Sequence, residues 1–253
     1  MPPLQLKIEE LTVYRTARSE GDHQILLVHG ALDRAAGLIR VARRLRPHQV
    51  VRYDRRGYGR SENATPTTSF SQQVDDLNAV VGDRPTVVFG HSYGGVIALA
   101  SATQGNAALK AVATFEAPRA WEEWWPAPPP KDTDPADAAE HFLRRVIGDE
   151  RWEGLPELVR KRRRAEGPLM VEELQAQSER RYDARSINIP LVVGVGEQSG
   201  AHAQRAASCT AEEAQRSRLV TITGAGHAAP TTHPDAIADL VRHAITDAEI
   251  TNQ

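Results

Sequence analysis

Short runs of apolar, mostly β-branched residues alternate along the chain with segments in which apolar residues recur every three or four positions. The runs are typical of strands buried on both faces, and the spaced positions are typical of helices with one buried face. This alternation predicts a mostly parallel sheet that helices cover on both faces. Eight strands are expected, at 4–8, 11–15, 24–28, 49–53, 86–89, 110–115, 190–195 and 218–222, and the first two are expected to form an antiparallel edge.

The pattern changes after Pro118, where the segment WEEWWPAPPPKDTDP is too rich in proline and acidic residues to continue a sheet. Three helical patterns follow this segment before the alternation resumes near residue 190. We therefore expect one core domain with a helical cap, or lid, inserted after the sixth strand. The expected core is 1–118 and 187–253, the cap is 119–186, and its helices are expected at 136–147, 156–164 and 171–182.

Composition and charge narrow the class of protein. The 253 residues fit one large domain with an insertion, and the formal net charge of −2 gives no attraction to nucleic acid or to an anionic membrane. No apolar run approaches the roughly 18 residues that a membrane span needs. The single cysteine and the absence of an apolar leader favour a cytoplasmic protein, and the charge leaves a homodimer open.

The sequence GHSYGG at 90–95 stands between a predicted strand and a predicted helix. In that context the pattern G-x-S-x-G is typical of a nucleophile elbow, a tight turn that exposes a serine at the edge of a sheet. Side chains at Gly90 and Gly94 would collide with neighbouring backbone in such a turn. Ser92 is therefore the candidate nucleophile, and the backbone N–H of Tyr93, which starts the helix, is a candidate oxyanion donor.

A serine hydroxyl needs a positioned base, because it is a weak nucleophile at its ordinary pKa. His227 follows the last predicted strand in the segment GAGH, and it is the candidate base. His233 is the alternative, although it fits better as a residue that helps to start the final helix. The loop after the third strand, VHGAL at 28–32, turns sharply at Gly30 and offers the backbone N–H of Ala31 as the second oxyanion donor.

Together the segments VHGAL, DRRGYGRS at 54–61, GHSYGG and GAGH resemble those of the α/β-hydrolase superfamily over the whole chain. The resemblance implies an α/β-hydrolase fold, a serine hydrolase core and a helical cap over the active site. In that family the acid of the triad usually follows the seventh strand, in a segment of the type G-x-x-D. Here the segment reads GEQSG at 196–200, and its only carboxylate, Glu197, comes two residues too early.

Glu116 is the other candidate for the acid, because it ends the sixth strand beside the strand of the elbow. Adjacent strands lie about 4.8 Å apart, so a carboxylate there can reach the same edge of the sheet. The segment FEAP at 115–118 is similar to the segment of zearalenone-type lactonases and of some haloalkane dehalogenases in which a glutamate orients the histidine. We expect the triad Ser92, His227 and Glu116, with Glu197 as the alternative acid.

A serine nucleophile favours acyl transfer through a covalent ester, and the dehalogenase branch, which needs aspartate there, is excluded. The sequence has no dinucleotide fingerprint, no Walker loop and no Cys/His cluster with metal spacing, so no cofactor and no metal are expected.

Candidate substrate contacts lie after the sixth strand, where Trp121, Trp124 and Trp125 cluster. Leu32, beside the oxyanion loop, is a further candidate. Aromatic walls suit a bulky apolar or aromatic small molecule, so the expected function is hydrolysis of a carboxylic ester or lactone of that kind. C–C or thioester hydrolysis on the same triad, and a small-molecule receptor with vestigial activity, are the alternatives.

Overall fold

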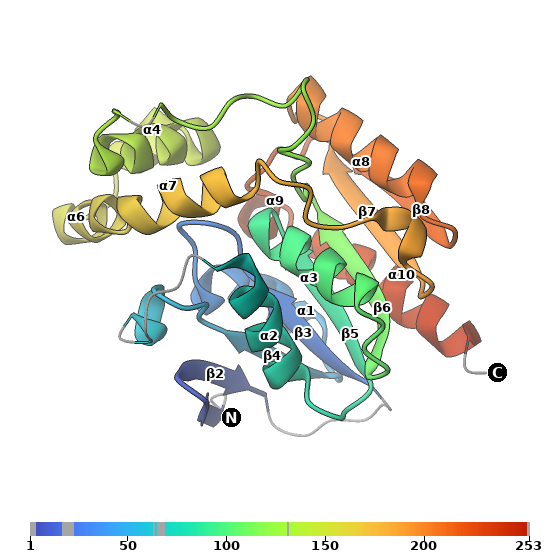
Figure 1. Ribbon diagram of the computed structural model, residues 1–253. Coiled ribbons are helices and arrows are strands. Elements are labelled where there is room, and N and C mark those ends of the chain that lie inside the picture. The colour runs from blue at the N-terminus through green and yellow to red at the C-terminus, as the bar shows by residue number, and fades with distance from the viewer. Residues whose placement is uncertain (1–3, 17–22, 63, 65–68, 131, 252–253) are drawn as a thin grey trace.

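A computed structural model describes residues 4–16, 23–62, 64, 69–130 and 132–251 of the chain (Figure 1). In these residues eight strands form one sheet in the order β1-β2-β4-β3-β5-β6-β7-β8. The strands are β1 (Leu4–Ile8), β2 (Leu11–Arg15), β3 (Gln24–Val28), β4 (Gln49–Tyr53), β5 (Thr86–His91), β6 (Leu109–Phe115), β7 (Leu191–Gly196) and β8 (Ser217–Ile222).

Each predicted strand is confirmed, and so is the antiparallel edge formed by β1 and β2. Strand β2 also runs antiparallel to β4, and all the other neighbouring pairs are parallel. The largest difference is in β5, which continues two residues further than expected, through Gly90 and His91. Parallel strands end at the same edge of a sheet, and at this edge Gly90 of β5 lies opposite Thr114 of β6.

Helices cover both faces of the sheet, as the alternation in the sequence predicts. Those outside the β6–β7 connection are α1 (Ile39–Arg44), α2 (Phe70–Val81), α3 (Tyr93–Thr103), α8 (Ala201–Glu213), α9 (Ala229–Thr232) and α10 (Pro234–Thr251), with short 3₁₀ turns η1 (Ala35–Leu38) and η2 (Gly59–Ser61). A third 3₁₀ turn, η3 (Ala184–Ser186), lies within that connection, shortly before β7.

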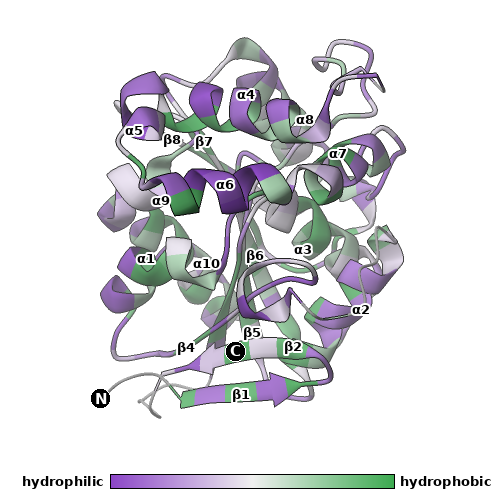
Figure 2. Ribbon diagram, turned by 90° about the vertical axis from the view of Figure 1, so that its left-hand side faces the viewer, coloured by the Kyte–Doolittle hydropathy of each residue, from purple (hydrophilic) through white to green (hydrophobic). Residues whose placement is uncertain are grey.

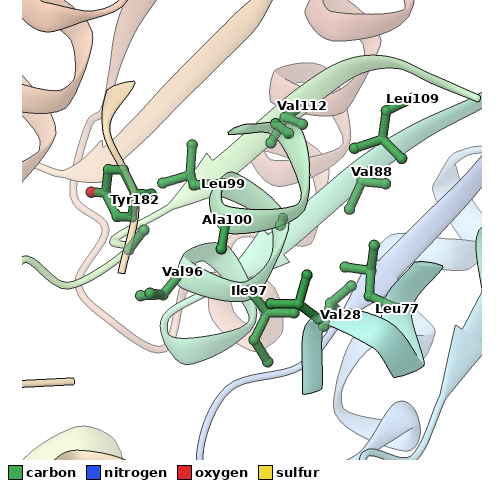
Figure 3. Close-up of a cluster of buried hydrophobic side chains, with 14 of the residues drawn as sticks. Val28, Leu77, Val88, Val96, Ile97, Leu99, Ala100, Leu109, Val112 and Tyr182 are labelled. Atoms are coloured by element: carbon green, nitrogen blue, oxygen red, sulfur yellow. The ribbon is translucent and has the colours of Figure 1, made fainter. Parts of the chain in front are cut away.

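Two apolar cores hold these layers together, because successive residues of a strand face opposite sides of the sheet. Leu26 and Val88 belong to the core under α2, α3 and α8, and Figure 3 shows Val88 and Leu77 within it. Their neighbours Ile25 and Val87 belong to the core under α1 and α10. Burial on both faces explains why these strands read as continuous apolar runs.

The β6–β7 connection is helical, as the change of pattern after Pro118 predicts. It contains α4 (Pro135–Ile147), α5 (Asp149–Glu153), α6 (Glu157–Ala165) and α7 (Gly167–Ala176). Figure 2 shows these helices together in the upper half of the view, with β1 and β2 at the bottom. Helix α7 starts four residues before its predicted range, because Pro168 fits the first turn of a helix, where no backbone N–H donor is needed.

A buried ion pair fastens α7 to the core. Arg55, the second residue after β4, and Glu173 of α7 are both fully buried, and Nη1 of Arg55 lies 2.5 Å from Oε1 of Glu173. Burial is the largest single influence and lowers the pKa of Arg55, but the charge and hydrogen bond of Glu173, together with Tyr58 and Tyr93, outweigh it, so the net pKa is raised. The guanidinium also donates to the carbonyl oxygens of His29 (3.1 Å) and Gly30 (3.0 Å), so one side chain connects α7 to the loop after β3.

No helix in the described part of the chain is long and apolar enough to cross a membrane.

We predict that Glu173→Leu lowers the free energy of unfolding by about 3–5 kcal/mol, because it leaves the guanidinium of Arg55 buried without a counter-charge. Urea denaturation of the whole chain measures the change. Glu172→Leu on the exposed side of the same helix is the matched control, with an expected change within about 0.5 kcal/mol. Equal losses in the two variants would show that the ion pair contributes nothing specific.

Candidate active site

Ser92 lies alone between the end of β5 and the start of α3, in a strained backbone conformation. Its φ is 53° and its ψ is −123°, in a region that residues other than glycine rarely adopt. The turn is held on both sides, since the N–H of Ser92 donates to the carbonyl of Phe115 (2.9 Å) and its carbonyl accepts from the N–H of Gly95 (2.8 Å). The residue lines a cavity of about 930 Å³.

The glycines around Ser92 are required by close backbone contacts, as the sequence predicts. A Cβ at Gly90 would lie 2.4 Å from the carbonyl oxygen of Gly94. A Cβ at Gly94 would lie 2.5 Å from the carbonyl oxygen of Val28. Both distances are shorter than real Cβ contacts, so neither position can carry a side chain without a shift of the backbone.

His227 and Glu116 meet in the cavity that Ser92 lines. Nδ1 of His227, in the loop after β8, lies 2.7 Å from Oε2 of Glu116, which directly follows β6. The carboxyl side chain is only 2% exposed, and both residues line the same cavity as Ser92. Glu116 also has a positive φ of 52°, and its N–H donates to the carbonyl of Gly194 at 3.0 Å.

The other oxygen of Glu116 has two donors. The N–H of Gly196 lies 3.0 Å from Oε1, and the hydroxyl of Ser199 donates to the same oxygen. Burial acts to raise the pKa of Glu116, but the hydrogen bond and charge of His227, with the bonds from Ser199 and Gly196, outweigh it and hold the pKa below its ordinary value. The carboxylate is therefore ionised, and a neutral His227 that donates from Nδ1 keeps its free lone pair on Nε2.

The two alternatives from the sequence lie elsewhere. Glu197 is exposed and accepts the backbone N–H of Gly224 at 2.8 Å. His233, at the end of α9, has Nδ1 at 2.9 Å from the hydroxyl of Thr232 and is absent from the cavity lining. The structure thus brings Glu116, and not Glu197, to His227.

The two candidate oxyanion donors come from the loops that flank Ser92. Ala31 lines the cavity, and a Cβ on the preceding Gly30 would lie 3.0 Å from Cβ of Ser92. Tyr93 is the first residue of α3, where backbone N–H groups have no partner within the helix. The ring of buried His29 holds the first loop, because its Nε2 accepts the N–H of Arg55 at 3.0 Å and its Nδ1 lies 2.8 Å from the carbonyl oxygen of Gly30.

His91, next to the nucleophile, contacts the backbone and the ring of the candidate base His227. Its Nε2 lies 2.9 Å from the carbonyl oxygen of His227, and the two rings are 4.8 Å apart. Burial, and then the charge of His227, lower the pKa of His91 to about 3. His91 is therefore neutral near pH 7 and donates to the backbone of His227 without competing for protons.

Only one of the four candidate substrate contacts, Trp125, lines the cavity, where it packs edge-on against His202 at 4.9 Å. Trp121 packs against Tyr182 at 5.0 Å, and Trp124 lies under the guanidinium of Arg205 at 4.6 Å. The segment forms successive turns and no helix, so the indoles diverge.

Leu32, 2% exposed, belongs to an apolar cluster with residues of α4, α5 and α7, and it is absent from the cavity lining. The structure therefore places Leu32, Trp121 and Trp124 outside the cavity wall.

Further residues line the cavity: His141, Phe142 and Arg145 contribute one face of α4, Ser199 lies in the turn after β7, and His202 lies in α8. From the sequence, a substrate contact is the less favoured interpretation of His141 and His202, and nothing indicates that Phe142, Arg145 or Ser199 line a cavity. The spacing of four residues between His141 and Arg145 is a helical signal, but nothing in the sequence says which face of α4 turns toward Ser92. Within the described residues no group of three His, Cys, Asp or Glu side chains could hold a metal ion.

Comparisons with known proteins agree with the fold. A family model described as "Alpha/beta hydrolase family" matches residues 25–240. Lipase LipV from Mycobacterium tuberculosis (strain ATCC 25618 / H37Rv) is 36% identical over 95 residues. Those residues cover 36% of this chain and only 36% of that lipase.

Two solved structures share the fold over nearly the whole chain. An alpha/beta hydrolase from Sphaerobacter thermophilus DSM 20745 is 26% identical, with a TM-score of 0.66, and the match covers 94% of this chain and 99% of that one. A lipase-esterase related protein from Clostridium acetobutylicum ATCC 824 is 15% identical, with a TM-score of 0.73 and coverage of 93% and 99%.

We predict that Gly94→Ala costs about 1–3 kcal/mol of unfolding free energy, because the new Cβ meets the backbone of the loop after β3. Urea denaturation measures the loss. Gly226→Ala, where a Cβ meets nothing within 4 Å, is the control and should change stability by less than about 0.5 kcal/mol. If Gly94→Ala is as stable as the control, the loop and the elbow are not in the tight contact described above.

Proposed function

The chain belongs to the alpha/beta hydrolase family, and we propose that it is a serine hydrolase that cleaves a carboxylic ester or lactone of a bulky apolar or aromatic small molecule. One observation carries this proposal. The hydrogen bond of 2.7 Å between His227 and buried Glu116 lies in the same cavity as the strained Ser92. The matched relative from Mycobacterium tuberculosis is named a lipase, which favours ester bonds within this family.

The first half of the reaction forms an acyl-enzyme. His227 takes the proton of the Ser92 hydroxyl at Nε2, Oγ attacks the carbonyl carbon, and Glu116 stabilises the imidazolium that forms. The N–H groups of Ala31 and Tyr93 bind the oxyanion of the tetrahedral intermediate. His227 then returns the proton to the leaving alcohol.

Water completes the cycle. His227 removes a proton from a water molecule that attacks the acyl carbon, and the collapse of the second intermediate releases the acid and restores the Ser92 hydroxyl. Glu116 remains ionised throughout, because its pKa is held low by His227, Ser199 and Gly196.

The substrate class follows from the walls of the cavity. A volume of about 930 Å³ lies near the upper end of ordinary ligand sites, and Trp125, Phe142 and Leu174 give it apolar and aromatic surface. Residues 119–186 act as the cap, since α4 and α7 contribute to this wall. Thioester or C–C hydrolysis would use the same triad, whereas a receptor would have no need for a strained serine.

We predict that a fluorophosphonate forms a single covalent adduct on Ser92, with fluoride as the leaving group and His227 as the acceptor of the serine proton. Mass spectrometry of the intact chain and of its peptides measures the adduct. Ser92→Ala is the control and should remain unlabelled. A folded wild-type protein that stays unlabelled would contradict the hydrolase assignment.

We predict that Glu116→Gln lowers kcat by up to about 10⁴-fold on any ester that is turned over, because His227 loses the partner that fixes its orientation and tautomer. A panel of aryl esters, macrolactones and thioesters supplies the substrate. Glu197→Gln, which changes an exposed carboxylate of the neighbouring loop, should stay within about threefold of wild type, since surface changes are usually small. The reverse order of effects would assign the acid to Glu197.

A further inference from the structure

The turn after β7 holds the catalytic carboxylate from the side opposite to His227. Ser199 donates its hydroxyl to Oε1 of Glu116, and the N–H of Gly196 reaches the same oxygen at 3.0 Å. Oε2 is left for Nδ1 of His227. A glutamate side chain has three rotatable bonds, so the two donors on Oε1 are what keeps Oε2 directed at the imidazole.

This turn is itself fixed to the loop that bears His227. Gln198 donates its backbone N–H to the carbonyl of Ala225 (2.8 Å), and Glu197 donates to that of Ile222 (3.0 Å). A Cβ on Gly196 would lie 2.3 Å from the carbonyl oxygen of Ala225, so only glycine allows this approach. The hydroxyl of Ser199 is therefore held in place by backbone contacts that do not depend on the substrate.

We propose that Ser199 is a positioning residue for the acid, because its hydroxyl and the N–H of Gly196 together fix the direction of the Glu116 carboxylate. This inference rests on the proposed function, because it assigns a role within that triad. It adds a residue from the turn after β7 to a site whose acid directly follows β6 and whose base lies in the loop after β8.

The electrostatic surroundings of Glu116 set the direction of the expected effects. The titratable groups that face it are His227 after β8, His91 on β5 and His202 on α8. Of the groups bonded to the carboxylate, Ser199 carries no charge and acts only through its hydrogen bond. Removal of that bond should raise the pKa of Glu116 and increase the proton affinity of the Glu116–His227 pair.

The experiment compares Ser199→Ala with Ser199→Thr, which retains a hydroxyl. The control is Ser178→Ala, which changes an exposed serine after α7. The rate of Ser92 labelling by a fluorophosphonate and the kcat of ester hydrolysis should fall about 10-fold in Ser199→Ala, since one charge-assisted hydrogen bond is lost. KM should stay unchanged, the acid limb of the rate profile should move to higher pH, and Ser199→Thr should recover most of the rate.

A measurement that needs no turnover distinguishes failure of this inference from failure of the proposed hydrolase function. The carboxyl ¹³C signal of Glu116, followed against pH by NMR, should titrate at higher pH in Ser199→Ala than in wild type. If this shift appears while wild type neither hydrolyses esters nor reacts with the fluorophosphonate, Ser199 positions the acid and the hydrolase proposal fails. If wild type is active but neither the rate, the acid limb nor the signal changes in Ser199→Ala, the positioning role is refuted.

Discussion

One hydrogen bond determines how the site is built: the contact of 2.7 Å between Nδ1 of His227 and Oε2 of Glu116, which joins residues 111 apart in the chain. Strand β7 lies between β6, which Glu116 follows, and β8, which leads to His227. Two strand spacings amount to about 10 Å, so the bond must pass over the end of β7. A glutamate side chain is long enough for this reach, and the N–H of Gly196, at the end of β7, donates to its other oxygen at 3.0 Å.

Backbone strain in the described residues is concentrated at the same edge. Of the four non-glycine residues with positive φ, three lie there, namely Leu32 after β3, Ser92 after β5 and Glu116 after β6. Each such conformation costs about 1–3 kcal/mol, and it persists only where the surroundings fix it. Apolar cores on both faces of the sheet, and the buried pair of Arg55 with Glu173, supply that rigidity.

The fold could be predicted from the sequence, because buried parallel strands and amphipathic helices leave strong periodic signals. The sequence also indicated the positions of Ser92 and His227, since the elbow requires glycines that only a tight turn explains. It left two carboxylates open as the acid, because the length of a side chain and the path of a neighbouring turn decide which one reaches the histidine. Ser199 stands where the segment G-x-x-D has its aspartate, but the sequence does not show that its hydroxyl donates to Glu116, since that hydrogen bond joins segments 83 residues apart.

The tryptophan cluster shows a further limit of the sequence. Three indoles within five residues favour an aromatic wall, yet only Trp125 lines the cavity. The backbone of that segment forms turns, and in turns the direction of each side chain depends on local tertiary contacts, here Tyr182 and Arg205. Periodicity cannot predict side-chain directions in turns. In a helix such as α4 it does predict which residues share a face, and the orientation of the helix then decides where that face points.

The most direct test of the account is a crystal structure of the protein after reaction with a phosphonate. We expect phosphorus bonded to Oγ of Ser92, the phosphoryl oxygen within hydrogen-bond distance of the N–H groups of Ala31 and Tyr93, and Nδ1 of His227 still bonded to Glu116. A phosphoryl oxygen directed away from both N–H groups, or a His227 ring turned from Glu116 to Glu197, would contradict it.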